Sequence, residues 1–271
     1  MSNSSTNNDF KVVAVTNQKG GVGKTTTTIN LSAALVELGK KVLIIDLDPQ
    51  GNASTGLGID YEQRNLTVYD VLLAEAAISS SILPTSMEGL DIVPSTVDLS
   101  SADIELIKTP NHSTSLSRAL VEDKTLADNY DFIFVDCPPS LSLLTINAMV
   151  VSDSVLIPLQ SEFFALEGLS QLMLSVREVR KSVNTGLRFE GVVLTMFDRR
   201  NNLSQQVEKD ARENLGELVF KTVIPRNVRV SEAPSHSVPV LTYEPRSRGA
   251  QAYRRLACLL YTSDAADERL R

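Results

Sequence analysis

Two hydrophobic patterns alternate along the chain: short runs of consecutive apolar residues, and longer segments whose apolar residues recur at helical spacing. The runs predict strands at residues 12–16, 42–46, 90–93, 132–136, 154–158 and 191–196, with a possible seventh at 221–224. The segments between them predict helices at residues 25–38, 67–73, 101–107, 115–126, 144–151, 166–183 and 205–215. Because the strands are continuously apolar, both faces of the sheet are expected to be buried. The pattern therefore predicts an α/β fold: a single domain with a mostly parallel, twisted sheet covered by helices on both faces.

The composition fits this expectation. The chain has 271 residues, 42% of them hydrophobic, which suffices for a substantial core. No stretch approaches the roughly 18 consecutive apolar residues of a membrane helix. Residues 1–10 are polar, lack the features of a signal peptide and are expected to form a disordered tail, so we expect a cytoplasmic protein. The net charge of −7 argues against a globally basic nucleic-acid-binding protein but allows a local basic patch.

A glycine-rich segment, KGGVGKTT, joins the first predicted strand to the first predicted helix. It matches the phosphate-loop pattern G-x-x-x-x-G-K-[ST] except for the missing first glycine, and its context argues against an ordinary glycine-rich turn. The glycines let backbone N–H groups surround a phosphate, and the helix N-terminus adds a favourable dipole. Lys24 is predicted to reach the β- and γ-phosphates and the Thr25 hydroxyl to bind Mg²⁺. The predicted nucleotide-binding residues of this phosphate-loop (P-loop) NTPase are Lys19, Gly20, Gly21, Val22, Gly23, Lys24, Thr25 and Thr26.

A second lysine, Lys19, opens the loop. It suggests a nucleotide shared between two copies of the chain, in which Lys19 of each copy reaches the phosphates bound by the other, as an arginine finger does in trans. A site completed only by a second copy is slow and switchable. Lys19 is therefore predicted, with Lys24, to act in catalysis.

Two predicted strands end in carboxylates. The strand at 42–46 continues into DLDPQGN, where Asp48 is placed to orient or deprotonate an attacking water and Asp46 to help hold the metal. The strand at 132–136 ends in Asp136, as expected of a Walker-B strand whose carboxylate supports Mg²⁺ directly or through water. Aspartates also end strands simply at the solvent, and this alternative stays open for Asp46 and Asp48. Together these residues predict Mg²⁺-dependent hydrolysis of ATP.

Several motifs, in order along the chain, resemble the ParA/Soj partitioning ATPases of the deviant-Walker superfamily, which includes MinD. They are TNQKGGVGKTTTTINL, LDPQGNASTGLG, DCPPSLSLLTINA, ALEGLSQL, IPRNVRVSEAPSH and YEPRSRGAQAYRRLA, within residues 11–257. The resemblance implies an ATP-dependent homodimer that binds double-stranded DNA without sequence preference, associates with the nucleoid and does not bind membranes. It also implies a ParB-type centromere-binding partner that stimulates hydrolysis. Pro225 and Asn227 match the family segment that lies against the adenine.

The DNA-binding surface is predicted from four arginines. By resemblance, Arg200 and Arg229 match positions of basic residues that family members use on DNA. From the sequence itself, Arg199 and Arg200 follow one predicted strand and Arg226 and Arg229 follow another, so they are expected to form a local basic surface. Contacts from such a surface to phosphates would give salt-dependent, sequence-independent affinity. Ordinary solvated arginines are the alternative.

Two other functions remain open. A MinD-like membrane-cycling, division-site ATPase would need a basic amphipathic C-terminal helix, and the acidic end of this sequence offers none. An iron–sulfur protein of the nitrogenase iron-protein type would need four thiolates at the dimer interface. The chain has two cysteines, Cys137 and Cys258, of which only Cys137 lies within the family resemblance.

Residues 258–271 depart from the family pattern. The stretch CLLYTSDAADE resembles a translated sequencing-library adaptor, so we expect this segment to be non-native and the ATPase domain to span residues 11–257. The segment before Lys11 has no basic residue, whereas some relatives carry a basic N-terminal segment implicated in stimulation by the partner.

Overall fold

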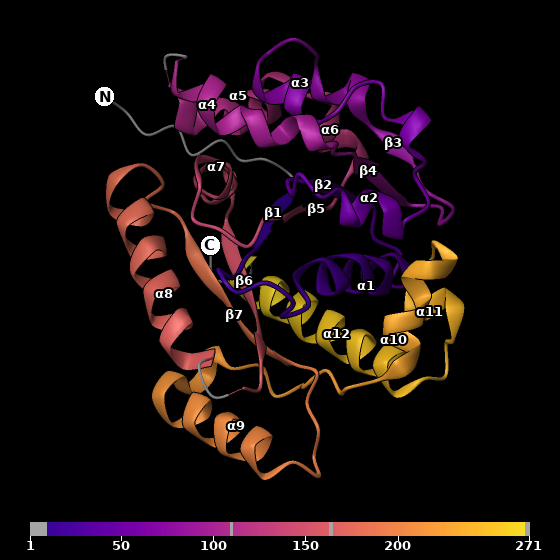
Figure 1. Ribbon diagram of the computed structural model, residues 1–271, viewed down its shortest axis with the longest axis vertical. Coiled ribbons are helices and arrows are strands. Elements are labelled where there is room, and N and C mark those ends of the chain that lie inside the picture. The colour runs from indigo at the N-terminus through magenta and orange to yellow at the C-terminus, as the bar shows by residue number, and fades with distance from the viewer. Residues whose placement is uncertain (1–9, 109–110, 163–164, 269–271) are drawn as a thin grey trace.

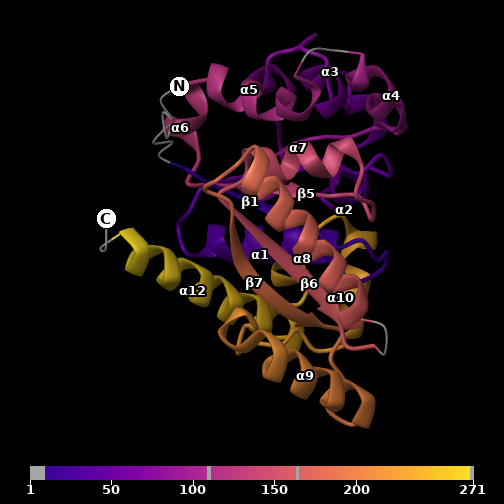
Figure 2. The same ribbon diagram turned by 90° about the vertical axis from the view of Figure 1, so that its left-hand side faces the viewer.

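The computed structural model describes residues 10–108, 111–162 and 165–268, and in them seven strands form one sheet with helices on both faces (Figure 1, Figure 2). The strand order is β3-β4-β2-β5-β1-β6-β7, and every neighbouring pair is parallel except β3–β4. The strands are β1 (Lys11–Val15), β2 (Val42–Asp46), β3 (Leu83–Pro84), β4 (Leu90–Val93), β5 (Phe132–Asp136), β6 (Ser154–Gln160) and β7 (Arg188–Thr195). The predicted α/β fold with a mostly parallel, helix-covered sheet is confirmed.

The helices form two layers, one on each face of the sheet. One layer packs with an apolar cluster that includes Val12 and Ala14 of β1; its helices are α3 (Val68–Leu72), α4 (Ala102–Ile107), α5 (Ser115–Glu122), α6 (Thr125–Asn129), α7 (Leu143–Val151), α8 (Ala165–Ser182) and α9 (Asn202–Leu215). The other layer packs with a cluster that includes Val13 and Val15; its helices are α1 (Lys24–Glu37), α2 (Asn52–Gly56), α10 (Val228–Glu232), α11 (Val240–Tyr243) and α12 (Arg248–Glu268). The alternation along β1 shows why the central strands carry apolar residues on both sides of the sheet: helices cover both faces.

The strand register places the functional residues together. Parallel pairing aligns Asp46 at the end of β2 with Asp136 at the end of β5, and Val15 at the end of β1 with the same Asp136. The phosphate loop leaves β1 at this edge of the sheet and leads directly into α1. The carboxyl ends of three central strands therefore converge beside the N-terminus of one helix, which is where ligands bind in open parallel sheets.

Two expectations about secondary structure are corrected. Residues 221–224 form no strand; only isolated bridges at Val219 and Pro225 pair this segment with the sheet region. The helix expected at 115–126 is two helices, α5 and α6, separated at Asp123 and Lys124, because the Asp123 carboxylate accepts hydrogen bonds from the Thr125 amide and hydroxyl and starts a new helix there.

Phe10, assigned from the sequence to the polar tail, is only 5% exposed and packs into the core, so the ordered domain begins before Lys11. The rest of that predicted tail, residues 1–9, lies outside the described residues. At the other end, α12 continues without a break across residue 257, and Leu260 is buried against the helix layer that contains α1.

Candidate nucleotide-binding site

The phosphate loop has the backbone geometry of an anion-binding loop. Gly21 and Gly23 have φ values of 74° and 85°, a region that side-chain-bearing residues rarely adopt. A Cβ added to Gly21 would meet no atom within 4 Å, so its backbone conformation, rather than space, calls for glycine there. Val22 is buried, and its carbonyl accepts a 2.8 Å hydrogen bond from the Thr195 hydroxyl, which fastens the loop to the end of β7.

Lys24 lies inside the loop. Its Nζ donates a hydrogen bond of 3.2 Å to the carbonyl of Lys19, so the side chain folds back across the loop from the end of the loop to its start. Burial lowers the pKa of Lys24, and the negative charges of Asp136 and Asp48 oppose that shift. The Lys24 ammonium is therefore near enough to Asp136 and Asp48, two of the three predicted carboxylates, to be attracted by both. The predicted residues Thr25 and Thr26 occupy the first turn of α1.

Asp136 has the environment expected of a cation ligand. The residue is fully buried; its Oδ1 accepts a 3.0 Å hydrogen bond from the Thr28 hydroxyl, and its Oδ2 has no hydrogen-bond partner among the described residues. Burial, followed by repulsion from Asp46, raises the pKa of Asp136, while the Thr25 and Thr28 hydroxyls and Lys24 oppose the rise. A buried carboxylate oxygen beside a threonine hydroxyl suits Mg²⁺, which usually takes one or two carboxylates plus phosphate oxygens and water.

Both carboxylate oxygens of Asp46, unlike those of Asp136, accept hydrogen bonds. Its Oδ2 accepts hydrogen bonds from the Ser54 amide at 2.9 Å and the Ser54 hydroxyl at 2.7 Å, and its Oδ1 accepts one from the Asp48 amide at 3.3 Å. Burial raises the pKa of Asp46, and the two Ser54 hydrogen bonds oppose the rise. The geometry fits a carboxylate that fixes the loop after β2; its predicted contact with the metal stays a prediction.

Asp48 follows β2 and is almost completely buried. Its Oδ1 accepts a hydrogen bond of 3.0 Å from the Gln50 amide, and its backbone carbonyl accepts one of 2.9 Å from the Gly51 amide. These bonds shape a tight turn at residues 48–51. The Asp48 side chain therefore sits on a structured turn at the same sheet edge as Lys24 and Asp136.

Lys19 does not point into its own loop. Its amide donates to Asn17 Oδ1 at 3.0 Å, and its Nζ lies 2.5 Å from Glu162 Oε2, just beyond β6. The carboxylate of Glu162 is held in turn by the Gln160 side-chain amide. In a single chain the two predicted catalytic lysines thus have different partners: Lys24 Nζ bonds a carbonyl of the phosphate loop, and Lys19 Nζ pairs with Glu162, which lies outside the loop.

Pro225 and Asn227 line a cavity of about 730 Å³ together with several arginines. Phe197, which also lines it, follows Met196, whose methyl group would lie 3.8 Å from a Cβ added to Gly23. One residue along the chain thus separates this cavity lining from a contact with the phosphate loop. The Asn227 side chain accepts hydrogen bonds from the amides of Arg229 and Val230 and so caps α10.

Three of the four predicted DNA-binding arginines lie in this cavity: Arg199, Arg200 and Arg226. Arg229 does not line it; its side chain is 52% exposed and pairs with Glu232 at 2.8 Å. Two further arginines of α12, Arg248 and Arg255, complete the lining and were absent from the predicted set. They are seven residues apart, a spacing that places both on one face of a helix, so the sequence did carry a signal for them.

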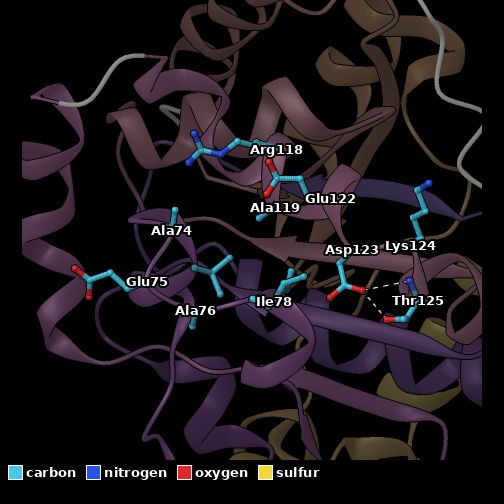
Figure 3. A pocket seen from close by; sticks show the side chains of 12 residues that line it. Ala74, Glu75, Ala76, Ile78, Arg118, Ala119, Glu122, Asp123, Lys124 and Thr125 are labelled. Atoms are coloured by element: carbon cyan, nitrogen blue, oxygen red, sulfur yellow. Dashed lines mark hydrogen bonds between the residues drawn. The ribbon is translucent and has the colours of Figure 1, made fainter.

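A separate cavity of about 550 Å³ lies where the segment after α3 meets α5 and α6 (Figure 3). Arg118 and Lys124 line it together with Glu75, Glu122 and Asp123. No predicted site residue is among its lining residues, and the mixture of charges indicates no particular ligand.

The two cysteines are both free thiols and lie in different environments. Cys137 is fully buried directly after Asp136, and Cys258 is exposed on α12. In the described part of the chain, no three His, Cys, Asp or Glu side chains come together as a protein-only metal site. The same residues include no helix with the length and apolar character needed to cross a bilayer.

Comparison with known proteins gives concordant matches. The model of a family described as an AAA domain, AAA_31, matches residues 10–189. The chain is 54% identical over 247 residues to the sporulation initiation inhibitor protein Soj of Bacillus subtilis, covering 91% of this chain and 96% of Soj. It is 54% identical over 250 residues to the chromosome partitioning protein ParA of Caulobacter vibrioides, covering 92% and 93%.

A solved structure is also similar over most of the chain. It is cobyrinic acid a,c-diamide synthase from Mycobacterium smegmatis with bound ADP and magnesium, with a TM-score of 0.81 and 35% sequence identity, covering 93% of this chain and 94% of that one.

Proposed function

The chain belongs to the ParA/Soj family of chromosome-partitioning ATPases, and we propose that it works as an ATP-dependent dimer that binds DNA non-specifically and releases it when a ParB-type partner stimulates hydrolysis. One observation carries this proposal: the loop has two lysines, and only Lys24 lies over it. The ammonium of Lys19 is directed outward beside the exposed Gly20, where a second copy would meet it. ATP bound between two copies would then decide whether the dimer forms.

Each residue of the site has its own proposed role in ATP binding or hydrolysis. The amides of the loop and Lys24 bind the β- and γ-phosphates, and Thr25 with Asp136 holds Mg²⁺. The similar structure from M. smegmatis, which contains ADP and magnesium, supports ATP and Mg²⁺ as the cofactors. Bound Mg²⁺ would neutralise charge on the phosphates. Asp48 orients the attacking water, and Lys19 from the partner copy adds positive charge to the phosphates.

DNA binding is assigned to the basic residues at the cavity edge and beside it. Arg199, Arg200 and Arg226 would contact phosphates, with Arg229 on the neighbouring α10. Two copies double the number of phosphate contacts, which couples DNA affinity to ATP. The positive charge is local, since the whole chain carries −7. Association with the nucleoid, and hence location in the cytoplasm, would follow from this affinity.

The MinD-like membrane-cycling function is less well supported. An interfacial helix needs a free apolar face. In α12 the apolar side chains Tyr253, Leu256 and Leu260 are buried within the domain, against the layer that contains α1. Within the described side chains of α12, this face is already used for folding.

We further propose that residues 11–257, extended at the start by the buried Phe10, form the ATPase domain and that residues 258–271 are non-native. The continuous α12 helix is compatible with either origin of this segment, because Leu260 is apolar and finds a buried position. Independent genomic reads across the coding region decide the question; reads that encode residues 258–271 unchanged would contradict the proposal.

The proposal is tested by measuring retention of a duplex DNA of arbitrary sequence with ATP, with ADP and without nucleotide, in the absence of any partner. We expect retention with ATP only, falling as salt is raised. Equal retention in all three conditions would contradict the ATP-dependent switch. Binding to anionic lipid vesicles with ATP, together with no DNA retention, would favour the membrane-cycling function instead.

A further inference from the structure

Arg64 forms a clasp beside the turn that carries Asp48. It follows the single-turn helix η1 (Tyr61–Gln63), and its guanidinium donates hydrogen bonds in three directions. Nε and Nη2 donate to the Ile59 carbonyl at 3.1 and 2.7 Å, Nη2 to the Thr55 hydroxyl at 2.9 Å, and Nη1 to the Ser95 carbonyl at 3.0 Å. One side chain therefore joins α2, the segment after it and the loop after β4.

The guanidinium packs against backbone that has no side chain. Gly51, at φ 61°, ends the turn at residues 48–51, and a Cβ added there would lie 2.6 Å from Arg64 Nη1 and 3.0 Å from the Ser95 carbonyl oxygen. Any larger residue at position 51 would displace the guanidinium or the turn. The glycine and the arginine thus fit each other as a pair.

A short series of hydrogen bonds connects the Arg64 clasp to Asp48. The Ser95 amide donates to the Ser54 hydroxyl at 3.1 Å, and this hydroxyl donates to Asp46 Oδ2 at 2.7 Å. The other oxygen of Asp46 accepts from the Asp48 amide. Arg64 is also attracted electrostatically by Asp46, the first of the negative groups acting on it. The position of Asp48 is therefore tied to the position of Ser95, which Arg64 holds.

We propose that Arg64 is a positioning residue for ATP hydrolysis: it holds the turn at residues 48–51 so that Asp48 meets the attacking water. The inference rests on the proposed role of Asp48. Arg64 has no contact with the phosphate loop or with Asp136 among its hydrogen bonds, so its loss should lower kcat and leave ATP affinity nearly unchanged. Displacing a catalytic group by about 1 Å can cost up to about 100-fold in rate, which sets the expected scale.

The first experiment measures kcat and ATP Kd, without DNA or partner, for the parent, Arg64→Ala and Arg212→Ala. Arg212 is the matched control, because it too donates to two backbone carbonyls, those of Val219 and Phe220, but on α9. We expect kcat of Arg64→Ala to fall about 10- to 100-fold with ATP Kd changed less than about threefold, and Arg212→Ala to match the parent. Millimolar methylguanidinium should restore part of the lost rate in Arg64→Ala only. An unchanged kcat, or an equal loss of kcat and ATP affinity, would overturn the proposal.

A second variant covers the case in which Arg64→Ala folds poorly. Gly51→Ala alone should lower kcat by pushing the guanidinium away, with ATP Kd nearly unchanged, and an unchanged kcat would overturn the proposal. Where Arg64→Ala is folded, adding Gly51→Ala to it should cost less than in the parent, because the nearest clash atom, Arg64 Nη1, is gone and only the Ser95 carbonyl oxygen remains. Fully additive losses would overturn the proposal. Asp48→Ala, measured in parallel, distinguishes a failure of the proposed role of Asp48 from a failure of the Arg64 inference. If Asp48→Ala turns over at the parental rate, the proposed role of Asp48 fails. If Asp48→Ala is inactive while Arg64→Ala has the parental kcat, only the Arg64 inference fails.

Discussion

The ammonium nitrogen of Lys19 lies 2.5 Å from a carboxylate oxygen of Glu162 in the same chain. Both side chains are nearly half exposed, at 42% and 48%. An ion pair of this exposure contributes only about 0–1 kcal/mol to stability, because water screens it and both side chains lose entropy. The contact is therefore weak enough to be exchanged for a triphosphate on a partner copy.

Lys19→Ala should leave the free energy of unfolding within about 1 kcal/mol of the parent and retain ATP binding by the single chain. It should abolish the ATP-dependent dimer and turnover, because the positive charge supplied in trans is gone. Light scattering with a non-hydrolysable ATP analogue measures the dimer. Glu162→Gln is the control, since it removes the same ion pair but keeps the lysine; if it loses the dimer equally, the effect belongs to the pair and not to Lys19.

Lys24→Ala should weaken ATP binding itself. A charged hydrogen bond to phosphate is worth about 1.5–3 kcal/mol, or about 10- to 150-fold in Kd. Calorimetric titration with the ATP analogue gives the value. Lys40→Ala is the control: this lysine lies past the opposite end of α1, paired with Asp131, and its loss should leave ATP Kd unchanged. An unaltered Kd in Lys24→Ala would remove this lysine from the phosphate site.

The sequence predicted the central sheet closely because continuous apolar runs are unambiguous there. The strands at 42–46, 90–93 and 132–136 agree with the structure residue for residue. The prediction failed at residues 221–224, which have strand character in the sequence but lie between two isolated bridges, at Val219 and Pro225. Short elements such as β3 and α2 were missed because two to five residues carry too little periodicity to predict.

The candidate site was predictable where a local motif encodes it. The phosphate loop, Asp48 and Asp136 each lie at the end of a recognisable strand or just beyond it, so their positions in the fold followed from the sequence. The Arg64 clasp did not, because its acceptors come together only when α2 and the segment after it, which carry Thr55 and Ile59, pack against the loop after β4, which carries Ser95. Nothing in the spacing of those residues indicates that they share one guanidinium.

Gly20→Val should separate ATP binding from dimerisation. A Cβ at Gly20 would meet only Pro139 Cβ, at 4.0 Å, which is an ordinary contact, so the single chain should accept it. The added side chain would project where the partner must approach beside Lys19. We expect normal folding and ATP binding, and no dimer by sizing chromatography with the ATP analogue.

Gly23→Ala is the contrasting variant in the same loop. Because Gly23 has φ 85°, a side chain there strains the backbone, and this variant should lose ATP binding as well as the dimer. A dimer of normal strength in Gly20→Val would contradict the proposed face of association.

Arg229→Glu should reduce DNA retention and leave DNA-independent ATPase activity nearly intact. Arg229 is half exposed and bridges to Glu232 three residues later, so the charge reversal should cost little stability and remove a phosphate contact. The measurement is DNA affinity across a salt series, where the slope should also become shallower.

Lys181→Glu is matched to this variant, because Lys181 is an exposed cation paired with Glu178 three residues earlier, but on α8. It should bind DNA like the parent apart from a small general loss from the added negative charge. If both reversals weaken DNA binding equally, the effect reflects net charge, and Arg229 makes no specific contact.

Cys137 should be chemically inert in the folded chain. Its thiol is fully buried after Asp136, and burial raises the pKa of Cys137 well above its ordinary value. In the unfolded chain the thiol ionises near its usual pKa of about 8.5. The contribution of this group to stability is therefore fully present below about pH 8.5 and is lost as the pH rises beyond it, because only the unfolded state then releases the proton. A Cys258→Ser variant, which leaves Cys137 as the remaining thiol, tests this inertness with an aromatic disulfide reagent. The reagent should label the variant only after denaturation, and the native variant should stay unlabelled between pH 7 and about 8.5. Rapid labelling of the native variant would mean that the thiol is accessible, and an iron–sulfur or metal role for Cys137 would have to be reconsidered.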